Sequence, residues 1–303
     1  MREAKLEPDV ISYSAGISAC EKGKQWQPAL ALLSEMWEAK LEPNVISYSA
    51  AISACEKGEQ WQRALALLSE MWEAKLEPSV ISYNAGISAC KKGEQWQRAL
   101  ALLSEMREAK LEPNVISYSA GISACEEGEQ WQRALALLSE MREAKLEPNV
   151  ISYSAGISAC EKGGQWQRAL ALLSEMREAK LEPDVISYNA GISACEKGKQ
   201  WQPALALLSE MREAKLEPDV ISYNAAICTS ERCSQWRHAF SLLRVMRERH
   251  VETNDISYNL CITAYERSSR NLAGLSCYRC IGLSRFRVSC EALSVWEPAG
   301  EPL

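Results

Sequence analysis

The sequence VISYNAGISACKKGEQWQRALALLSEMREAKLEPN, residues 80–114, is the unit from which this chain is built. Near-copies of these 35 residues follow one another from residue 10 to residue 254, and full copies begin at Val10, Val45, Val80, Val115, Val150, Val185 and Val220. A period of about 20–50 residues is typical of a solenoid, in which each unit buries its apolar face against its neighbours. The fold therefore depends on what one unit forms.

The first half of the unit predicts a short helix over residues 82–92. Small and apolar residues recur at spacings of three and four, which places them on one helical face: Tyr83, Gly86, Ile87 and Cys90. Ser82 is the expected N-cap, because its hydroxyl can accept a hydrogen bond from a free backbone N–H. Gly93 is expected to end the helix in the left-handed conformation.

The second half predicts another helix that begins near Trp96. Its apolar stripe consists of Trp96, Ala99, Leu100, Leu102, Leu103 and Met106. Pro28 and Pro203 stand shortly after the Trp in two copies, and proline is tolerated only in the first turn of a helix. Glu112 is pushed out of the helical region by the proline after it. Each unit is therefore an antiparallel helix pair, and the Trp is expected to pack in the core rather than to stack on a base.

The predicted fold is all-α, a right-handed superhelix of helix-turn-helix repeats. We expect a partial repeat over residues 1–9, seven full repeats over 10–254, a degenerate eighth repeat over 255–270 and an irregular tail over 271–303. The start, MREAKLEPD, is the end of a repeat rather than a signal or transit peptide. We therefore expect that the chain is a fragment whose preceding part is missing.

The composition narrows the classes of function. The net charge is −6, which does not indicate a basic nucleic-acid-binding tail, and no run of 18 apolar residues predicts a membrane span. Six cysteines share one repeat position, and stacked helices lie about 9–10 Å apart, which is too far for disulfides, whose Cα atoms lie within about 7 Å. The tail contains Cys277, Cys280 and Cys290 without a histidine. We predict free thiols, no metal site and no cofactor.

The unit closely resembles the pentatricopeptide repeat. The features that carry this resemblance are the 35-residue helix pair, V-I-S-Y-N/S at its head, Ala-Leu and a late Met in the second helix, and a closing Pro-Asn or Pro-Asp. The resemblance covers residues 1–270. Tetratricopeptide repeats fit less well, because their period is about 34 residues and their proline lies elsewhere relative to the Ala.

The resemblance implies single-stranded RNA binding, with one base read by each repeat. In that family the reading residues are the fifth and the last of the repeat. The fifth residues here are Ser14, Ser49, Asn84, Ser119, Ser154, Asn189, Asn224 and Asn259, and the last residues are Asn44, Ser79, Asn114, Asn149, Asp184, Asp219 and Asn254. These positions switch among Ser, Asn and Asp while the apolar positions stay fixed. Interchangeable helix caps and turns would explain the residue types, but not why the variation concentrates there.

The family code assigns a base to each repeat. Asn at the fifth position favours pyrimidines and Ser favours purines, while Asp at the last position favours keto bases and Asn favours amino bases. From the repeat at Val10 onward this gives A, a purine left open by the Ser49/Ser79 pair, C or U, A, G, U, and C or U. The second residue, Ile in all eight units, sandwiches the base in the family, although packing between repeats is an equally good interpretation.

A third feature is a basic residue at the thirteenth position of seven units. These are candidate phosphate contacts: Lys22, Lys57, Lys92, Lys162, Lys197, Arg232 and Arg267. Glu127 is the exception and predicts a weak point in such a ladder. A cation there can also interact with the carbonyl end of the helix dipole, and the sequence does not distinguish the two roles.

Two alternatives to RNA binding stay open from the sequence. One is a protein-binding helical scaffold, and the other is a recent tandem duplication without a settled function. We do not expect an enzyme, because no H-x-E zinc motif, phosphate-binding loop or nucleophile–base set occurs. Protein partners would then supply any catalysis. The resemblance implies organellar RNA processing, in a mitochondrion or chloroplast, but no targeting peptide is present.

Overall fold

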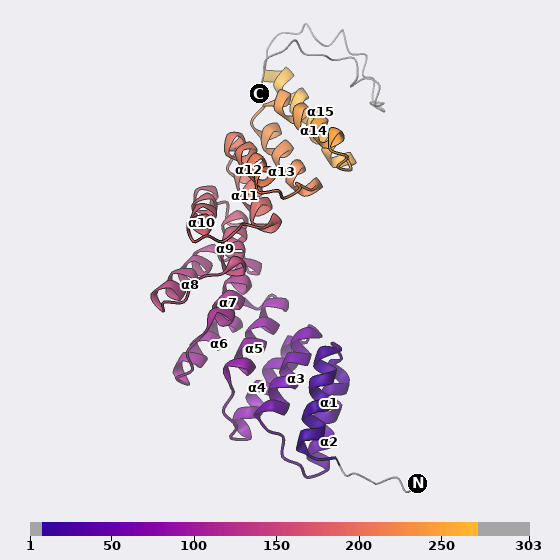
Figure 1. The fold of residues 1–303 in the computed structure, drawn as a ribbon, viewed down its shortest axis with the longest axis vertical. Coiled ribbons are helices and arrows are strands. Elements are labelled where there is room, and N and C mark those ends of the chain that lie inside the picture. The colour runs from indigo at the N-terminus through magenta and orange to yellow at the C-terminus, as the bar shows by residue number, and fades with distance from the viewer. Residues whose placement is uncertain (1–7, 272–303) are drawn as a thin grey trace, which may run out of the picture.

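The structure, a computed structural model, describes residues 8–271, which form helices joined by short turns (Figure 1). The odd-numbered helices, here called A helices, are α1 (Val10–Lys22), α3 (Val45–Lys57), α5 (Val80–Lys92), α7 (Val115–Glu127), α9 (Val150–Lys162), α11 (Val185–Lys197), α13 (Val220–Arg232) and α15 (Asp255–Asn271). The even-numbered helices, here called B helices, are α2 (Trp26–Glu38), α4 (Trp61–Glu73), α6 (Trp96–Glu108), α8 (Trp131–Glu143), α10 (Trp166–Glu178), α12 (Trp201–Glu213) and α14 (Trp236–Glu248).

The helices stack as a solenoid with two layers. Each A helix packs on its own B helix and on the next A helix, and each B helix also packs on the next A helix (Figure 1). Successive B helices lie further apart and contact each other through long side chains, as in the ion pair of Arg107 on α6 with Glu140 on α8 at 2.5 Å. The A layer is therefore the more closely spaced one and lies on the inner side of the curvature. The predicted all-α stack of helix pairs is confirmed.

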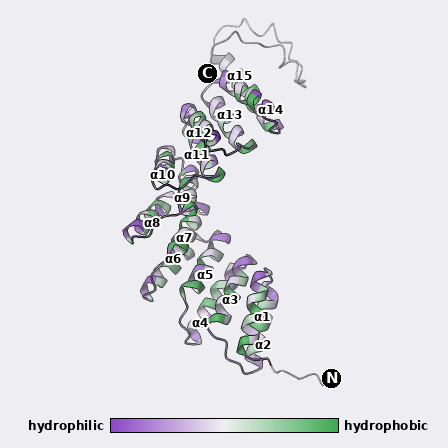
Figure 2. Ribbon diagram, viewed as in Figure 1, coloured by the Kyte–Doolittle hydropathy of each residue, from purple (hydrophilic) through white to green (hydrophobic). Residues whose placement is uncertain are grey.

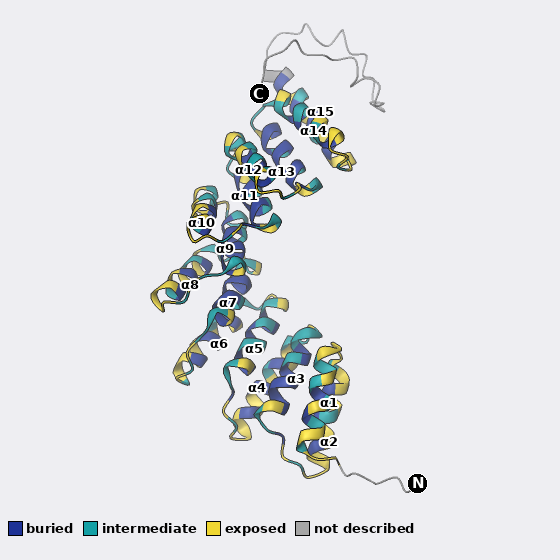
Figure 3. Ribbon diagram, in the orientation of Figure 1, coloured by how far each residue is buried: buried dark blue, intermediate teal, exposed yellow. Residues whose placement is uncertain are grey.

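The core runs between the two layers as one continuous apolar cluster. In the unit at residues 80–114, the A helix contributes Tyr83, Ile87 and Cys90, and the B helix contributes Leu103 and Met106, all of which are buried. Figure 2 shows apolar and polar residues alternating along each helix, and Figure 3 shows that burial is concentrated on the A helices. None of the described helices has the length and hydropathy needed to cross a membrane.

The prediction of the A-helix N-cap was wrong by three residues. Helix α5 begins at Val80, and its cap is Ser79, the last residue of the preceding repeat, whose side chain accepts from Ser82 N–H. Ser82 is instead the third residue of the helix. Its hydroxyl oxygen accepts a hydrogen bond from the backbone N–H of Ser79, which completes a capping box. The last residue of each repeat is therefore part of the helix that follows it.

The expected role of the turn glycine was also wrong. Gly93 has φ −88°, an ordinary value, and the left-handed residue of this turn is the non-glycine Glu94, with φ 56°. The glycine is needed for space. A Cβ atom on Gly93 would lie 2.2 Å from Cδ1 of Trp61, the first residue of the preceding B helix.

The Trp residues hold successive repeats together, as their predicted place on the apolar stripe suggested. Trp61 is partly buried, packs against the core, and lies between Gly93 and Arg98 of the next repeat, whose guanidinium carbon is 5.6 Å from the ring centroid. The same contact recurs where Arg63, Arg133 and Arg168 lie over the Trp rings of their preceding repeats.

The described cysteines are free thiols. Burial raises the pKa of Cys90 to about 11 and that of Cys195 to about 12, so both stay protonated at neutral pH and act as small apolar core groups. The cysteines at positions 277, 280 and 290 lie outside the described residues, as does the predicted irregular tail apart from Asn271, which ends α15.

Replacing Gly93 tests the glycine–tryptophan contact. We expect Gly93→Ala to destabilise the chain by about 1–3 kcal/mol, because the methyl group displaces Trp61. Gly23→Ala is the matched control, since Gly23 occupies the same repeat position and its added Cβ would meet no atom closer than 3.6 Å. Urea unfolding followed by circular dichroism measures both, and equal shifts of the midpoint would contradict the role of Trp61.

Candidate functional site

Three polar side chains meet at each junction between repeats, and we call them the junction cluster. They are the fifth residue of one repeat, its last residue, and the serine at the third position of the next repeat. In the repeat at Val80 these are Asn84, Asn114 and Ser117. Asn84 Nδ2 donates to Asn114 Oδ1 at 3.3 Å, and Ser117 Oγ donates to Asn84 Oδ1 at 2.6 Å. Helix stacking thus brings together two residues that are 30 positions apart.

The capping role of the last residue fixes which of its atoms points away from the helix. Asn114 Oδ1 accepts from the backbone N–H groups of Ile116 and Ser117, each at 3.0 Å. Only an oxygen can accept these bonds, so the amide oxygen lies over the helix N-terminus. Asn114 Nδ2 makes no hydrogen bond within residues 8–271 and is left as a donor.

An aspartate at the same position leaves an acceptor instead. Asp219 Oδ1 accepts from Ser222 N–H at 2.8 Å, and Asn189 Nδ2 donates to it at 3.4 Å. Burial raises the pKa of the Asp219 carboxyl, but these hydrogen bonds outweigh burial and hold the pKa below its ordinary value. The carboxylate is therefore ionised at neutral pH, and Oδ2 has no hydrogen bond within the described chain.

The fifth residue differs in how it is held. Where it is serine, it is buried, with 6–8% of its surface exposed, and Ser14, Ser119 and Ser154 each donate to the carbonyl four residues earlier at 2.7–2.8 Å. Where it is asparagine, as at Asn84, Asn189 and Asn224, the longer side chain is half-buried and reaches the last residue of its own repeat.

The second residue of every unit is an exposed isoleucine, which rules out core packing as its role. The exposed fraction is between 58% and 76% in all eight units: Ile11, Ile46, Ile81, Ile116, Ile151, Ile186, Ile221 and Ile256. Each isoleucine is one helical turn before the fifth residue and two residues after the preceding cap. Every polar pair is thus flanked in the chain by an apolar side chain from its own repeat and one from the next.

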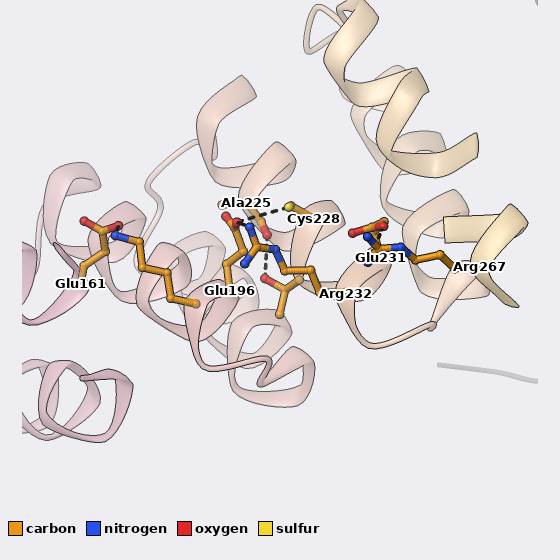
Figure 4. Close-up of polar contacts among 9 residues, drawn as sticks. Glu161, Glu196, Ala225, Cys228, Glu231, Arg232 and Arg267 are labelled. Carbon is orange, nitrogen blue, oxygen red and sulfur yellow. Dashed lines mark hydrogen bonds and ion pairs between the residues drawn. The ribbon is translucent and has the colours of Figure 1, made fainter. Parts of the chain in front are cut away.

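The cations at the thirteenth position form ion pairs with the preceding repeat, and Figure 4 shows part of this row. Six of the seven pair with the glutamate at the twelfth position of that repeat, as in Lys92–Glu56 at 2.7 Å, Lys197–Glu161 at 2.8 Å and Arg267–Glu231 at 3.0 Å. Lys57–Glu21, Lys162–Glu126 and Arg232–Glu196 repeat the pattern. Glu127, the exception in the sequence, accepts from Lys162 at 3.0 Å.

In the repeats whose fifth residue is Asn84, Asn189 or Asn224, that residue is hydrogen-bonded directly to the last residue of its own repeat. In the four repeats whose fifth residue is serine, the two proposed reading residues meet through the third-position serine of the next repeat, as Ser14 and Asn44 do through Ser47. Asn259, on α15, has no following repeat among the described residues, so it has no junction cluster. Sequence reasoning missed two participants, the third-position serine and the twelfth-position glutamate. Both recur at fixed places beside residues that were singled out, and this regularity was the available signal. No group of three or more potential metal ligands is found among the described residues.

Solved structures share this fold. A crystal structure of the pentatricopeptide repeat protein PPR10 in complex with an 18-nt psaJ RNA element is 18% identical, with a TM-score of 0.56 over 89% of this chain and 44% of that chain. PPR10 from maize, in another crystal structure, is 21% identical, with a TM-score of 0.50 over 88% of this chain and 48% of that chain. The chain therefore spans less than half the length of these PPR10 chains.

A third structure is a separate domain rather than a whole protein. The PPR domain of Arabidopsis thaliana protein-only RNase P 1, in complex with tRNA, is 17% identical, with a TM-score of 0.52 over 62% of this chain and 95% of that domain. At these sequence identities, the comparison shows that the structures share a fold. The comparison with curated proteins finds no match.

Two family models match the sequence over most of its length. The pentatricopeptide repeat domain matches within residues 56–198, in overlapping segments 56–93, 66–128, 102–165 and 136–198. The PPR repeat family matches residues 8–57, 183–230 and 218–267. Because these matches together extend from residue 8 to residue 267, the chain belongs to the pentatricopeptide repeat family.

Proposed function

We propose that this protein binds single-stranded RNA in a sequence-selective manner, and that each full repeat reads one base through its fifth and last residues. One observation carries the proposal: the cap bonds hold each asparagine or aspartate at the last position with one polar atom turned away from the helix, beside the fifth residue of the same repeat. The similar structures of PPR10 and of the RNase P domain, each in complex with RNA, support the same class of ligand.

The side-chain polar atom that the last residue does not use in the helix cap accounts for the preference of the family code for keto or amino bases. Guanine and uracil carry a ring N–H on their pairing edge, and adenine and cytosine carry an unprotonated ring nitrogen there. Asp219 leaves a carboxylate oxygen, which can accept from the ring N–H of G or U. Asn114 leaves an amide N–H, which can donate to the ring nitrogen of A or C.

The fifth residue selects by size and by hydrogen bonding. Serine is short, and Ser119 is bonded to its own helix, which leaves room for a purine. Asparagine extends further, and Asn84 Nδ2 keeps a second N–H beyond the one that it donates to Asn114. That N–H can donate to the carbonyl oxygen beside the ring nitrogen of a pyrimidine. The exposed isoleucines supply apolar surfaces for the two faces of the base.

The cations at the thirteenth position remain proposed phosphate contacts, but their ion pairs limit how a phosphate can approach them. Because each of six is held by a glutamate, a phosphate has to share or displace that carboxylate. The resemblance extends the proposal to organellar RNA processing, with protein partners supplying any catalysis.

The base assignment can be tested directly by titration. We expect RNA with A, purine, pyrimidine, A, G, U and pyrimidine in consecutive positions to bind at least about tenfold more tightly than a scrambled RNA of the same composition, because several matched hydrogen bonds contribute. Fluorescence anisotropy at fixed salt measures both affinities. Equal affinities would reject base reading, while leaving RNA binding itself measurable.

A substitution in the second repeat should create a base preference. Ser79 caps α5, but its single hydroxyl leaves no second polar atom. Ser79→Asp should favour G over A at the second nucleotide, and Ser79→Asn should favour A over G, each by roughly 0.5–1.5 kcal/mol. Serine, aspartate and asparagine are all good N-caps, so we expect the wild type and the two variants to have similar stability. The same preference in both variants would contradict the role of the outward atom.

Removing the paired glutamates should reveal the phosphate contacts. Glu56→Gln with Glu161→Gln frees Lys92 and Lys197. We expect the slope of log affinity against log salt to become more negative by up to about 1.4, at about 0.7 for each single-strand contact. Lys92→Gln with Lys197→Gln is the opposing variant and should flatten the slope. Slopes unchanged in both variants would show that these cations do not meet phosphates.

A further inference from the structure

The serine at the third position of a repeat does more than complete a capping box. It is fully buried at each junction, and it belongs to the repeat after the reading pair that it contacts: Ser47, Ser82, Ser117, Ser152, Ser187, Ser222 and Ser257. Its hydroxyl lies 2.5–2.8 Å from the fifth residue of the preceding repeat at every junction. The reading pair of one repeat is therefore completed by its neighbour.

The contact differs in kind between the two types of fifth residue. At Asn84, Asn189 and Asn224, the serine donates to Oδ1 of the amide at 2.5–2.6 Å. This bond decides which end of the amide is buried. The oxygen is held against the serine, and Nδ2 is turned toward the last residue of the repeat, at 3.3–3.4 Å.

Within the described chain, the other hydrogen bond of each of these asparagine side chains is the longer one from Nδ2 to the last residue, at 3.3–3.4 Å. A serine at the fifth position is different, because Ser119 also donates to Val115 O at 2.7 Å and Ser154 to Val150 O at 2.7 Å. Loss of the junction serine leaves such a residue anchored to its own helix. Loss of the same serine beside an asparagine removes the shorter of its two hydrogen bonds, so only the 3.3–3.4 Å bond from Nδ2 keeps the amide from turning over and offering its oxygen where it had offered an N–H.

We infer that the third-position serine is a positioning residue for base reading by the preceding repeat, required where the fifth residue is asparagine and dispensable where it is a serine that donates to its own helix. The inference rests on the proposed function. It also assigns a role to α15, because Ser257 of this helix donates to Asn224 at 2.6 Å and so completes the reading pair of the seventh full repeat.

Two alanine variants at equivalent positions test this in a crossed design. Ser117→Ala should reduce the preference for pyrimidine over purine at the third nucleotide by roughly three- to tenfold, the equivalent of one hydrogen bond, and leave the sixth nucleotide unaffected. Ser222→Ala should reduce the preference at the sixth nucleotide and leave the third unaffected, because Ser222 donates its hydrogen bond to Asn189. Each variant loses a capping-box bond, so a general loss of stability acts on both nucleotides and cannot produce the crossed pattern.

Ser152→Ala is the matched control, since it also removes a capping-box serine but faces Ser119. We expect the base preference at the fourth nucleotide to change less than twofold. Affinities for RNAs that differ at one nucleotide, measured with circular dichroism to confirm folding, give all three results. An undiminished pyrimidine preference in Ser117→Ala, or an equal loss in Ser152→Ala, would overturn the inference. Wild-type protein without a preference at the third nucleotide would instead reject the proposed function.

Discussion

The structure depends on a helix cap that crosses the boundary between repeats. The side chain of the last residue of one repeat accepts hydrogen bonds from the free backbone N–H groups at the start of the next A helix, as Asn114 does for α7. Such a bond requires an oxygen, so it leaves only one orientation for the side chain. The same bond that starts each helix therefore determines which polar atom faces away from it, and it is this atom to which the proposed function assigns base recognition.

Other contacts at the junction keep the stack in place. On one side, five of the Trp residues at the start of B helices fit against the glycine of the next repeat, as Trp61 does at Gly93. On the other side, six repeats each provide a cation that pairs with a glutamate of the preceding repeat, as in Lys92–Glu56. An exposed pair of this kind contributes little alone, about 0–1 kcal/mol. Repetition along the solenoid makes the row matter more for charge than for stability, because each glutamate offsets the charge of its cation.

Much of the fold was predictable because the same apolar spacing and the same turn residues recur in every repeat. The spacing of Tyr83, Ile87 and Cys90 located one buried face, and the proline at position 28 located the first turn of a B helix. The errors arose where one residue type serves two physical purposes. Ser82 is a good cap by type but acts as the third residue of the helix, and Gly93 suits a left-handed turn but is needed for the approach of Trp61. Local propensity could not separate these roles, because the deciding neighbour lies in another repeat.

The sequence alone determined the period, the helix pairs and the two variable positions, since all three are visible in how near-identical copies agree and differ. It also selected the exposed isoleucines without deciding their role, because an apolar residue on a helix fits a core as well as a surface. Only the tertiary structure showed that they face outward, that residues 30 positions apart form one pair, and that a serine from the next repeat holds that pair. The reason is physical: a helix fixes the neighbours of a side chain at three and four residues, whereas contacts across a junction depend on how the stacked helices are offset.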